Sequence, residues 1–398
     1  MRNDLGKVRF WRAAVASPLP WTSWAALHRL LHPGERRALD EALARRSPAS
    51  RRIAISVAHE QFLEHVRDLW QALERASALA PLLVGPTWFP PRRYKTELFR
   101  FLGDRYGLAY GRDVLPHPWL AEAGVELLLE LTVSRYGEGI AKVMYAHGMA
   151  GLGFTKDLAD VRYLERYRAA FLTGPLHRRA LAAAARLHGA RLPELVDVGY
   201  LRGDRLRARA RSFDRRGYLE RLELEPVRPL VLYAPTWGAG SSLASWLDPL
   251  ISITSRIGAS LAVRLHPITL HDPRWSTRLA AIEASARHVR ARPSHDLDDE
   301  LLAADVIVSE ASGLGVEFLT LGKPAVFLPA ERYFELYGRE RPEWWVRAQP
   351  EPGNESELAR ALGAAIGGAR GPSAADDLVY NPGRALDVML DAIRSLIG

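Results

Sequence analysis

The chain has 398 residues, 48% of them hydrophobic and 25% charged, with a formal net charge of +8. This length is large for one hydrophobic core and natural for two domains of ordinary size. Cysteine is absent, which excludes a disulfide framework and a thiolate metal site. No run of about 18 apolar residues and no apolar signal region occurs, so the sequence predicts neither a secreted nor a membrane-spanning protein.

Arginine supplies almost all of the positive charge, because only five of the 54 basic residues are lysine. Guanidinium groups bind phosphate in bidentate fashion and stay charged when half buried, which suits nucleotides, lipid head groups or nucleic acid. A GC-rich genome is an equally good explanation of this composition. The arginines are spread over the whole chain and no nucleic-acid-binding motif is present, so we expect no nucleic-acid partner.

Residues 1–50 combine aromatic side chains with pairs of arginines, among them Trp11, Trp21 and Trp24. This mixture is typical of a helical arm that lies on an anionic bilayer, with aromatics at the interface and arginines on phosphates. A helical extension packed on the following domain is the alternative interpretation. Both interpretations stay open.

Short apolar runs alternate with segments of helical period from Arg52 onward. Strands that are apolar throughout and separated by helices indicate a parallel sheet covered on both faces. The first series of expected strands covers 52–57, 81–85, 126–131, 142–148, 169–175 and 195–200. Helices are expected between several of these strands, at 62–76 and 175–187 for example.

A polar, arginine-rich stretch at 203–228 follows, which we interpret as a linker or a helix at a domain edge. The second series of expected strands covers 229–235, 260–267, 288–293, 305–310 and 324–329. The helices expected beside them cover 242–257, 273–285, 313–321 and 355–367. The sequence therefore predicts an α/β protein with two Rossmann-like domains whose parallel sheets face each other across a cleft.

The expected domain limits follow from these two series. They are an N-terminal extension at 1–50, a first Rossmann-like domain at 51–225, a second at 226–380, and a last helix within 381–398 that can cross back onto the first domain.

Five of the expected strands end in residues capable of chemistry. Ligands of open α/β sheets sit beyond the carboxyl ends of the strands, so these residues are expected to collect at one edge. The residues are His147 and Gly148 with a glycine-rich loop reaching Lys156, then Arg202 and Arg205, Thr236, Arg264 and His266, and the run from Ser309 to Gly313.

The run "VSEASGLG" passes from a strand into a helix without a spacer. The first amides of a helix that starts near Gly313 have no partner within the helix and carry partial positive charge. Ser309 and Ser312 add hydroxyl donors, and Gly313 and Gly315 allow close approach of the backbone to a ligand. The run therefore predicts a phosphate site, with an ordinary N-cap turn as the alternative. Glu310 is better suited to ribose hydroxyls or a base than to the anion.

Several segments resemble the CDP-glycerol glycerophosphotransferase family, the teichoic-acid primases and polymerases, which have a GT-B fold. They run in order from about 142 to 330 and are "VMYAHGM", "VDVGYLRGDRL", "LVLYAPTW", "RLHP" and "DDELLAADVIVSEASGLGVEFLTLGKPAVFLP". The resemblance implies a GT-B-like architecture, with an acceptor domain followed by a nucleotide-donor domain.

The same resemblance implies roles for single residues. His147 would be the general base on the acceptor hydroxyl, with Gly148 and Lys156 on the acceptor side. His266 would contact the donor diphosphate and stabilise charge on the transferred phosphoryl group. Donor phosphate and nucleotide would be bound by Thr236, Arg264, Ser309, Glu310, Ser312 and Gly313.

The implied activity is transfer of a polyol phosphate from a CDP-alcohol to a hydroxyl of a polyprenyl-linked glycan, in cell-wall or surface polymer synthesis. The enzyme would work in the cytoplasm, peripherally on the inner face of the membrane, with neither a metal nor a cofactor. The family usually has threonine-aspartate-tyrosine-serine-serine where this chain has Ser309 to Gly313.

Two alternatives remain. The serine-glycine pair followed by Glu317 also resembles nucleotide-sugar GT-B glycosyltransferases and UDP-GlcNAc 2-epimerases. A scaffold without activity is the other alternative.

Overall fold

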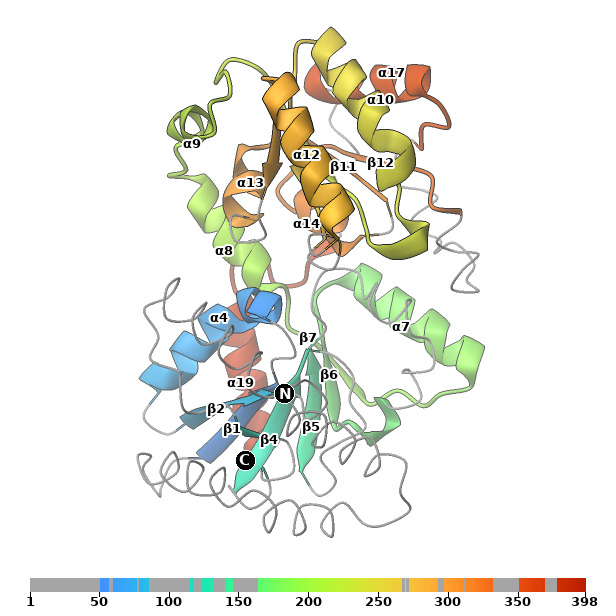
Figure 1. Cartoon of the computed structure of the whole chain (residues 1–398). Coiled ribbons are helices and arrows are strands. Elements are labelled where there is room, and N and C mark those ends of the chain that lie inside the picture. The colour runs from blue at the N-terminus through green and yellow to red at the C-terminus, as the bar shows by residue number, and fades with distance from the viewer. Residues whose placement is uncertain are drawn as a thin grey trace, which may run out of the picture.

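A computed structural model of the chain describes residues 51–56, 60–76, 79–85, 115–116, 120, 124–131, 140–145, 164–266, 269, 272–292, 297–310, 312–331, 351–368 and 378–398. Its elements form two parallel sheets, each flanked by helices, one above the other in Figure 1. The two-sheet α/β architecture expected from the sequence is thereby confirmed. The expected N-terminal extension at 1–50 lies outside the described residues.

The first sheet has seven strands in the order β3-β2-β1-β4-β5-β6-β7, and every neighbouring pair is parallel. Each of the six strands expected in this part of the sequence corresponds to a strand of this sheet. Only the two-residue β3 was not expected. The strands are β1 (Arg51–Ser56), β2 (Leu79–Gly85), β3 (Leu115–Pro116), β4 (Val125–Glu130), β5 (Ala141–Tyr145), β6 (Ala169–Leu172) and β7 (Glu194–Asp197).

Alternate residues of these strands enter two different cores. Ile53 and Ile55 of β1 pack on one face with helices α4 (Glu60–Arg75) and α19 (Ala385–Ile397), whereas Ala54 packs on the other face with Leu128 of β4. Helix α7 (Pro175–His188) covers the β5 and β6 part of that other face through Leu181. Burial on both faces explains why the strands are apolar throughout.

The second sheet has five parallel strands in the order β10-β9-β8-β11-β12. All five were expected from the sequence. They are β8 (Leu230–Ala234), β9 (Ser260–Arg264), β10 (Val289–Arg292), β11 (Val306–Ser309) and β12 (Ala325–Phe327).

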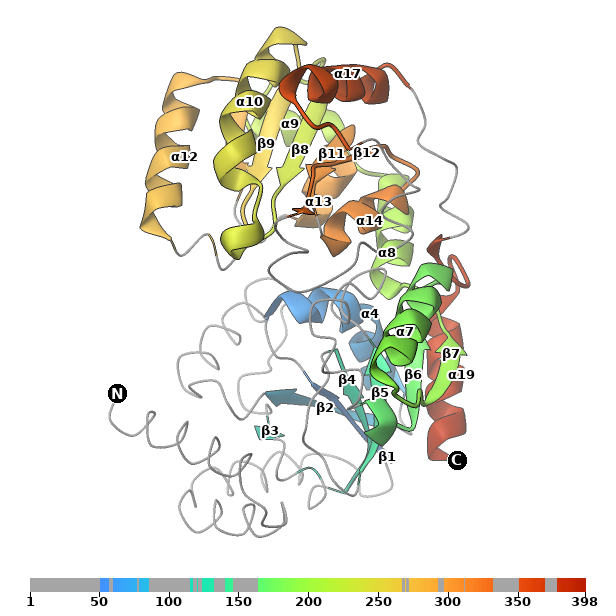
Figure 2. The ribbon, with the colours of Figure 1, turned by 90° about the vertical axis from the view of Figure 1, so that its right-hand side faces the viewer.

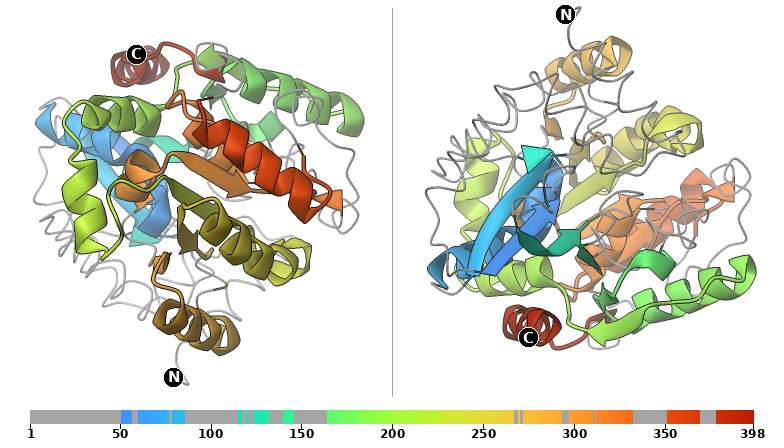
Figure 3. Two further views of the ribbon diagram at one scale, coloured as in Figure 1. Left: turned by 90° about the horizontal axis from the view of Figure 1, so that it is seen from above. Right: turned by 90° about the horizontal axis from the view of Figure 1, so that it is seen from below.

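Two sets of helices cover the faces of the second sheet, as the views from the side and from above show (Figures 2 and 3). The first set packs with Val231 and Tyr233 of β8, and the second packs with Leu230 and Leu232. The first set is α10 (Leu243–Arg256), α12 (Pro273–Ser285) and α17 (Glu355–Ile366). The second set is α8 (Leu201–Ala210), α9 (Arg215–Arg221), α13 (Leu297–Ala303) and α14 (Gly313–Leu319).

The arginine-rich stretch at 203–228 is helical, which corresponds to the second of the two interpretations made from the sequence. Its helices are α8 and α9, and Asp214 caps the second by accepting a hydrogen bond from the Gly217 amide at 2.9 Å. Two arginines of α8, Arg202 and Arg205, are largely removed from solvent. They hold the two halves of the molecule together.

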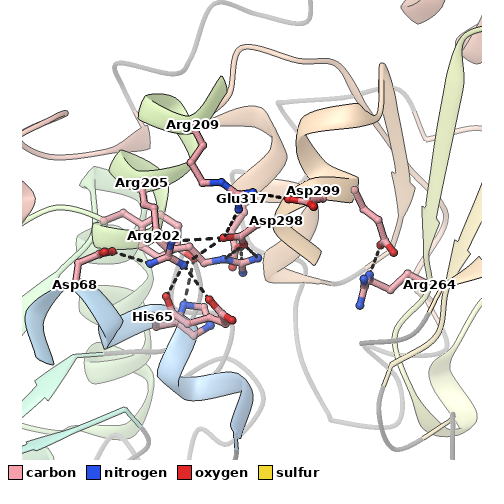
Figure 4. A network of polar contacts seen from close by, with 12 residues as sticks. His65, Asp68, Arg202, Arg205, Arg209, Arg264, Asp298, Asp299 and Glu317 are labelled. Carbon is pink, nitrogen blue, oxygen red and sulfur yellow. Dashed lines mark hydrogen bonds and ion pairs between the residues drawn. The ribbon is translucent and has the colours of Figure 1, made fainter. Parts of the chain in front are cut away.

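Arg202, at the start of α8, is the centre of a buried ionic network (Figure 4). Its guanidinium is 2% exposed and donates to Asp298 of α13 at 2.8 Å and to Glu317 of α14 at 2.7 Å. Arg205 joins the network to α4 of the first domain, where it pairs with Asp68 at 2.6 Å and Glu64 at 3.1 Å. The network thus links α4, α8, α13 and α14.

The C-terminal helix α19 packs against the first sheet, although it is the last element of the chain (Figure 2). The segment leading into it passes against the first domain's backbone, where the Tyr380 amide donates to the Thr173 carbonyl at 2.9 Å. A Cβ atom at Gly199 would lie 2.3 Å from the Tyr380 carbonyl oxygen. Glycine at this position therefore allows the two backbone segments to cross.

No helix within the described ranges has both the length and the apolar character required to span a membrane.

Gly199 provides a test of this crossing. It has a φ of +103°, so Gly199→Ala would combine backbone strain of about 1–2 kcal/mol with a backbone clash. Gly189 has a φ of +60° and open space around it, so Gly189→Ala would show the strain alone. We expect the first variant to lower the denaturant midpoint clearly more than the second. Equal effects would contradict a close backbone crossing.

Asp298 provides a test of the buried network. Removal of one partner from a buried ion pair costs about 3–5 kcal/mol, so Asp298→Asn should strongly destabilise the protein at pH 7. Asp299→Asn, one residue further on, breaks only the half-exposed pair with Arg209 and should cost about 0.2–1 kcal/mol.

The effect of Asp298→Asn should depend on pH. Burial works against the Asp298 charge, but Arg202 and Arg205 outweigh it and hold the pKa of Asp298 well below its usual range. A depressed folded-state pKa contributes stability that is present above about pH 4 and is lost as the pH falls further. In urea unfolding, the difference in unfolding free energy between the wild type and Asp298→Asn should therefore be large at pH 7 and smaller near about pH 3. An equal difference at both pH values would contradict the ionised pair.

Candidate functional site

Strands β8 and β11 mark the point where the strand order of the second sheet reverses. Open α/β sheets bind ligands beyond the carboxyl ends of their strands at such a point. The two strand ends are joined directly, because the Ser309 hydroxyl donates to the Ala234 carbonyl at 2.7 Å. Ser309 and Thr236, both expected from the sequence to bind the donor, therefore lie at the same strand ends.

Glu310 follows β11 and is fully buried. Its Oε1 atom accepts from the amides of Thr236 at 2.7 Å and Ser242 at 3.0 Å, and its Oε2 atom accepts from the Ser242 hydroxyl at 2.9 Å. Burial raises the pKa of the Glu310 carboxyl, and these hydrogen bonds oppose that rise. The carboxylate is engaged by the protein's own loop, which does not favour the expected contact with ribose or base.

Ser312 and Gly313 form the start of α14. The Ser312 hydroxyl accepts from the Leu314 amide at 3.3 Å and caps the helix, as the N-cap interpretation anticipates. Gly315 has a packing role instead of allowing close ligand approach: a Cβ atom there would lie 2.5 Å from the Phe327 ring. The expected phosphate contacts of Ser312 and Gly313 stay predictions.

Arg264, at the end of β9, is a buried cation beside the reversal point. Its Nε atom donates to Glu300 of α13, and its Nη2 atom has no hydrogen-bond partner within the part of the chain that the structure describes. A buried N–H group without a partner costs about 1–3 kcal/mol, and more when it is charged. An anion at this strand end would satisfy that group. Figure 4 shows Arg264 beside the network of α13.

His266 follows Arg264 by two residues and is half-buried. Its ring lies against that of Trp237, with 6.0 Å between the ring centroids. Trp237 belongs to the loop that Glu310 holds through Thr236. Residues from three neighbouring strand ends, β8, β9 and β11, are therefore brought together as the sequence anticipated.

The expected acceptor residues His147, Gly148 and Lys156 lie outside the described residues. The described part of β5 ends two residues before His147, at Tyr145. The buried Tyr145 hydroxyl accepts from the Leu201 amide at 3.2 Å, and this contact fixes the end of β5 to the start of α8. Burial raises the pKa of Tyr145 above its usual range, so the phenol is protonated near neutral pH.

Sequence reasoning missed two side chains that organise this site, Glu300 and Asp298. The two acids lie on one short helix and hold different arginines, Arg264 and Arg202. Their partners are 36 and 96 residues away in the chain. A run of acids before a buried strand was the only local signal, and it cannot identify such distant partners.

Lys323, in the "LGKP" segment, supports the other end of α13. Its ammonium donates to the carbonyls of Leu301, Leu302 and Ala304 at 3.1, 2.6 and 2.8 Å. Burial lowers the pKa of Lys323 to about 8. This lysine therefore caps the C-terminus of the helix whose N-terminal acids bind the two arginines.

Within the described residues, no group of three or more histidine, aspartate or glutamate side chains is arranged to hold a metal ion.

Comparison with known proteins agrees with this arrangement. Residues 166–352 match the family model described as CDP-glycerol:poly(glycerophosphate) glycerophosphotransferase. The matched range contains β8, β9 and β11 with all their site residues. No curated protein matches the chain by sequence.

Structures of two kinds are among the solved structures that resemble the chain. A variant of the wall teichoic acid polymerase TagF is similar over 94% of this chain and 97% of its own, with 13% identity and a TM-score of 0.62. The UDP-GlcNAc 2-epimerase of Methanocaldococcus jannaschii, in complex with UDP-GlcNAc and UDP, is similar over 86% of this chain and 99% of its own, with 11% identity and a TM-score of 0.61. At such identities these likenesses show the fold.

The fold is GT-B, and the family match covers the strand ends where Thr236, Arg264, His266 and Ser309 meet. The match over residues 166–352 and the fold together support a CDP-glycerol glycerophosphotransferase-like transferase, the enzyme class that the sequence predicted.

Proposed function

We propose that the protein transfers a polyol phosphate, glycerol phosphate or a close relative, from a CDP-alcohol to a hydroxyl of a membrane-linked glycan. The observation that carries the proposal is the match of residues 166–352 to the glycerophosphotransferase family at the reversal point of the second sheet. A structure of TagF was obtained after a soak with CDPG, which supports a donor of this class.

The donor diphosphate would lie at the carboxyl ends of β8, β9 and β11. Arg264 supplies a buried N–H group without a described partner, and His266 stands beside it. Cationic and hydrogen-bonding groups fixed around the transferred phosphoryl stabilise the charge that develops there, and no solvent must reorganise. The bond between the acceptor oxygen and the β-phosphorus would form as CMP leaves.

Deprotonation of the acceptor hydroxyl requires a base. We propose His147 for this role, with Gly148 and Lys156 beside the acceptor, because the resemblance assigns the histidine-glycine pair to it. Histidine titrates near neutral pH, which suits a general base. These residues lie outside the described part of the chain, so their role rests on the sequence.

A nucleotide-sugar enzyme is the second candidate, because the fold also resembles UDP-GlcNAc 2-epimerases. The sequence resemblance behind this alternative relies on Glu317 as a ligand contact. In the structure Glu317 is 4% exposed in its side chain and is paired with Arg202 at 2.7 Å. That glutamate is committed to the contact between domains, which favours the CDP-alcohol donor.

His266 provides the test of the chemistry. His266→Ala removes a group proposed to stabilise the transferred phosphoryl, so CMP release from CDP-glycerol should fall by about 10²–10³-fold. His288→Ala is the matched control, because that half-buried histidine contacts the Ile251 carbonyl away from the strand ends. It should leave turnover close to that of the wild type.

The donor class would be decided by the same preparation. A ligand raises the unfolding temperature of a protein only if it binds the folded state. CDP-glycerol should therefore raise the unfolding temperature of the wild type, and UDP-GlcNAc should not. The opposite result, with a shift for UDP-GlcNAc alone, would overturn the proposed function in favour of the second candidate.

Membrane association is proposed for residues 1–50 because they combine tryptophan and arginine. The full chain should float with vesicles that contain anionic lipid at low salt, and a chain lacking residues 1–50 should not. High salt should weaken flotation, since the arginine contacts are screened. If the full chain stays unbound at low salt, the membrane role of this segment is wrong.

A further inference from the structure

We propose that Glu310 is a positioning residue for the donor site, and that it acts through the loop between β8 and α10 without contacting the donor. The proposal deepens the proposed function, because it concerns the same strand ends. It assigns to Ser242 and Glu310 a joint role in holding Thr236 and Trp237 in place.

The contacts of Glu310 join the two ends of this loop. The Thr236 amide lies two residues after β8, and Ser242 lies immediately before α10. One carboxylate oxygen accepts both backbone amides, at 2.7 and 3.0 Å, and the other accepts the Ser242 hydroxyl at 2.9 Å. A single fully buried side chain directly after β11 therefore closes the loop that follows a different strand, β8.

The loop in turn bears on the donor residues. Trp237 follows Thr236, and its ring lies 6.0 Å from that of His266. Ser309, the neighbour of Glu310, holds the carbonyl at the end of β8. A shift of Glu310 would therefore move Thr236 and Trp237 relative to His266, and it would not remove any group proposed to contact the phosphate.

The hydrogen bonds around Ser242 require an acceptor at position 310. The Ser242 hydroxyl donates to Glu310, so its oxygen accepts from the buried Tyr233 hydroxyl at 2.7 Å. Tyr233 therefore donates to Ser242, and Ser242 donates to the carboxylate of Glu310. With glutamine at position 310, the side-chain amide would donate to the Ser242 hydroxyl. The Ser242 hydroxyl would then donate to Tyr233, so the Tyr233 hydroxyl proton would lose its acceptor. An aspartate side chain at position 310 would be too short to reach Thr236 and Ser242.

These contacts predict different results for two variants of the full-length protein. Glu310→Gln keeps an oxygen for both amides and loses only the acceptor of the Ser242 hydroxyl, so it should disturb the loop less than Glu310→Asp. Glu310→Asp should lose the amide contacts, which are worth about tenfold in an equilibrium. Hydrogen exchange of the Thr236 and Ser242 amides should then accelerate by about tenfold.

The donor readout is the KM for CDP-glycerol together with kcat for CMP release. Glu310→Asp should raise KM by about tenfold with a smaller change in kcat, and Glu310→Gln should stay closer to the wild type. Glu283→Asp is the control, since Glu283 accepts the Ala291 amide at 2.6 Å elsewhere in the same domain. It should leave KM unchanged.

The outcomes separate this proposal from the proposed function. Unchanged exchange in Glu310→Asp overturns the loop contact, and faster exchange with an unchanged donor KM overturns the positioning role. If the wild type binds UDP-GlcNAc and not CDP-glycerol, the proposed function fails, and the UDP-GlcNAc affinities of the same variants decide the positioning role. If Glu310→Asp does not fold, Glu310→Ser takes its place in both measurements, with the same expected direction.

Discussion

The arrangement of the two sheets depends on one buried guanidinium. Arg202 starts the helix that follows the first sheet, and its partners Asp298 and Glu317 belong to helices of the second sheet. Burial opposes its charge, yet Glu317 and Asp298 raise the pKa of Arg202 above its usual value, so the group remains ionised. Buried charges are tolerated only with such complete pairing. These ion pairs therefore hold the two sheets with the carboxyl ends of their strands facing each other.

The same acidic turn of α13 serves two purposes. Asp298 holds the arginines of α8, and Glu300, two residues later, holds Arg264 at the end of β9. Lys323 fixes the opposite end of this helix through three carbonyl groups. A helix of seven residues is thus secured at both ends. Arg264 and the contact between the two sheets therefore share one rigid support.

Most of the fold could be predicted from sequence, because strands buried on both faces leave continuous apolar runs such as those of β8 and β11. The strand ends that form the candidate site could be predicted too, since a parallel sheet gathers its carboxyl ends at one edge. The partners of Arg202 and Glu310 could not, because those contacts join residues 68 to 115 positions apart and leave no local pattern. Glu310 illustrates the limit: a motif shows that an acid is present and not which atoms it faces.

The crossing of the C-terminal segment at Gly199 has a consequence for biosynthesis. Ile53 and Ile55 of the first strand share a core with Met389 and Ile393 of the last helix. Because α19 follows the second sheet in the chain, the part of this face that α19 covers stays exposed until the second sheet has been synthesised, although α4 already covers the rest. The second sheet has no such dependence on α19, because its clusters contain no residue of that helix. Completion of the first sheet's core therefore follows synthesis of the second sheet, and the apolar surface that waits for α19 is exposed to aggregation in the nascent chain.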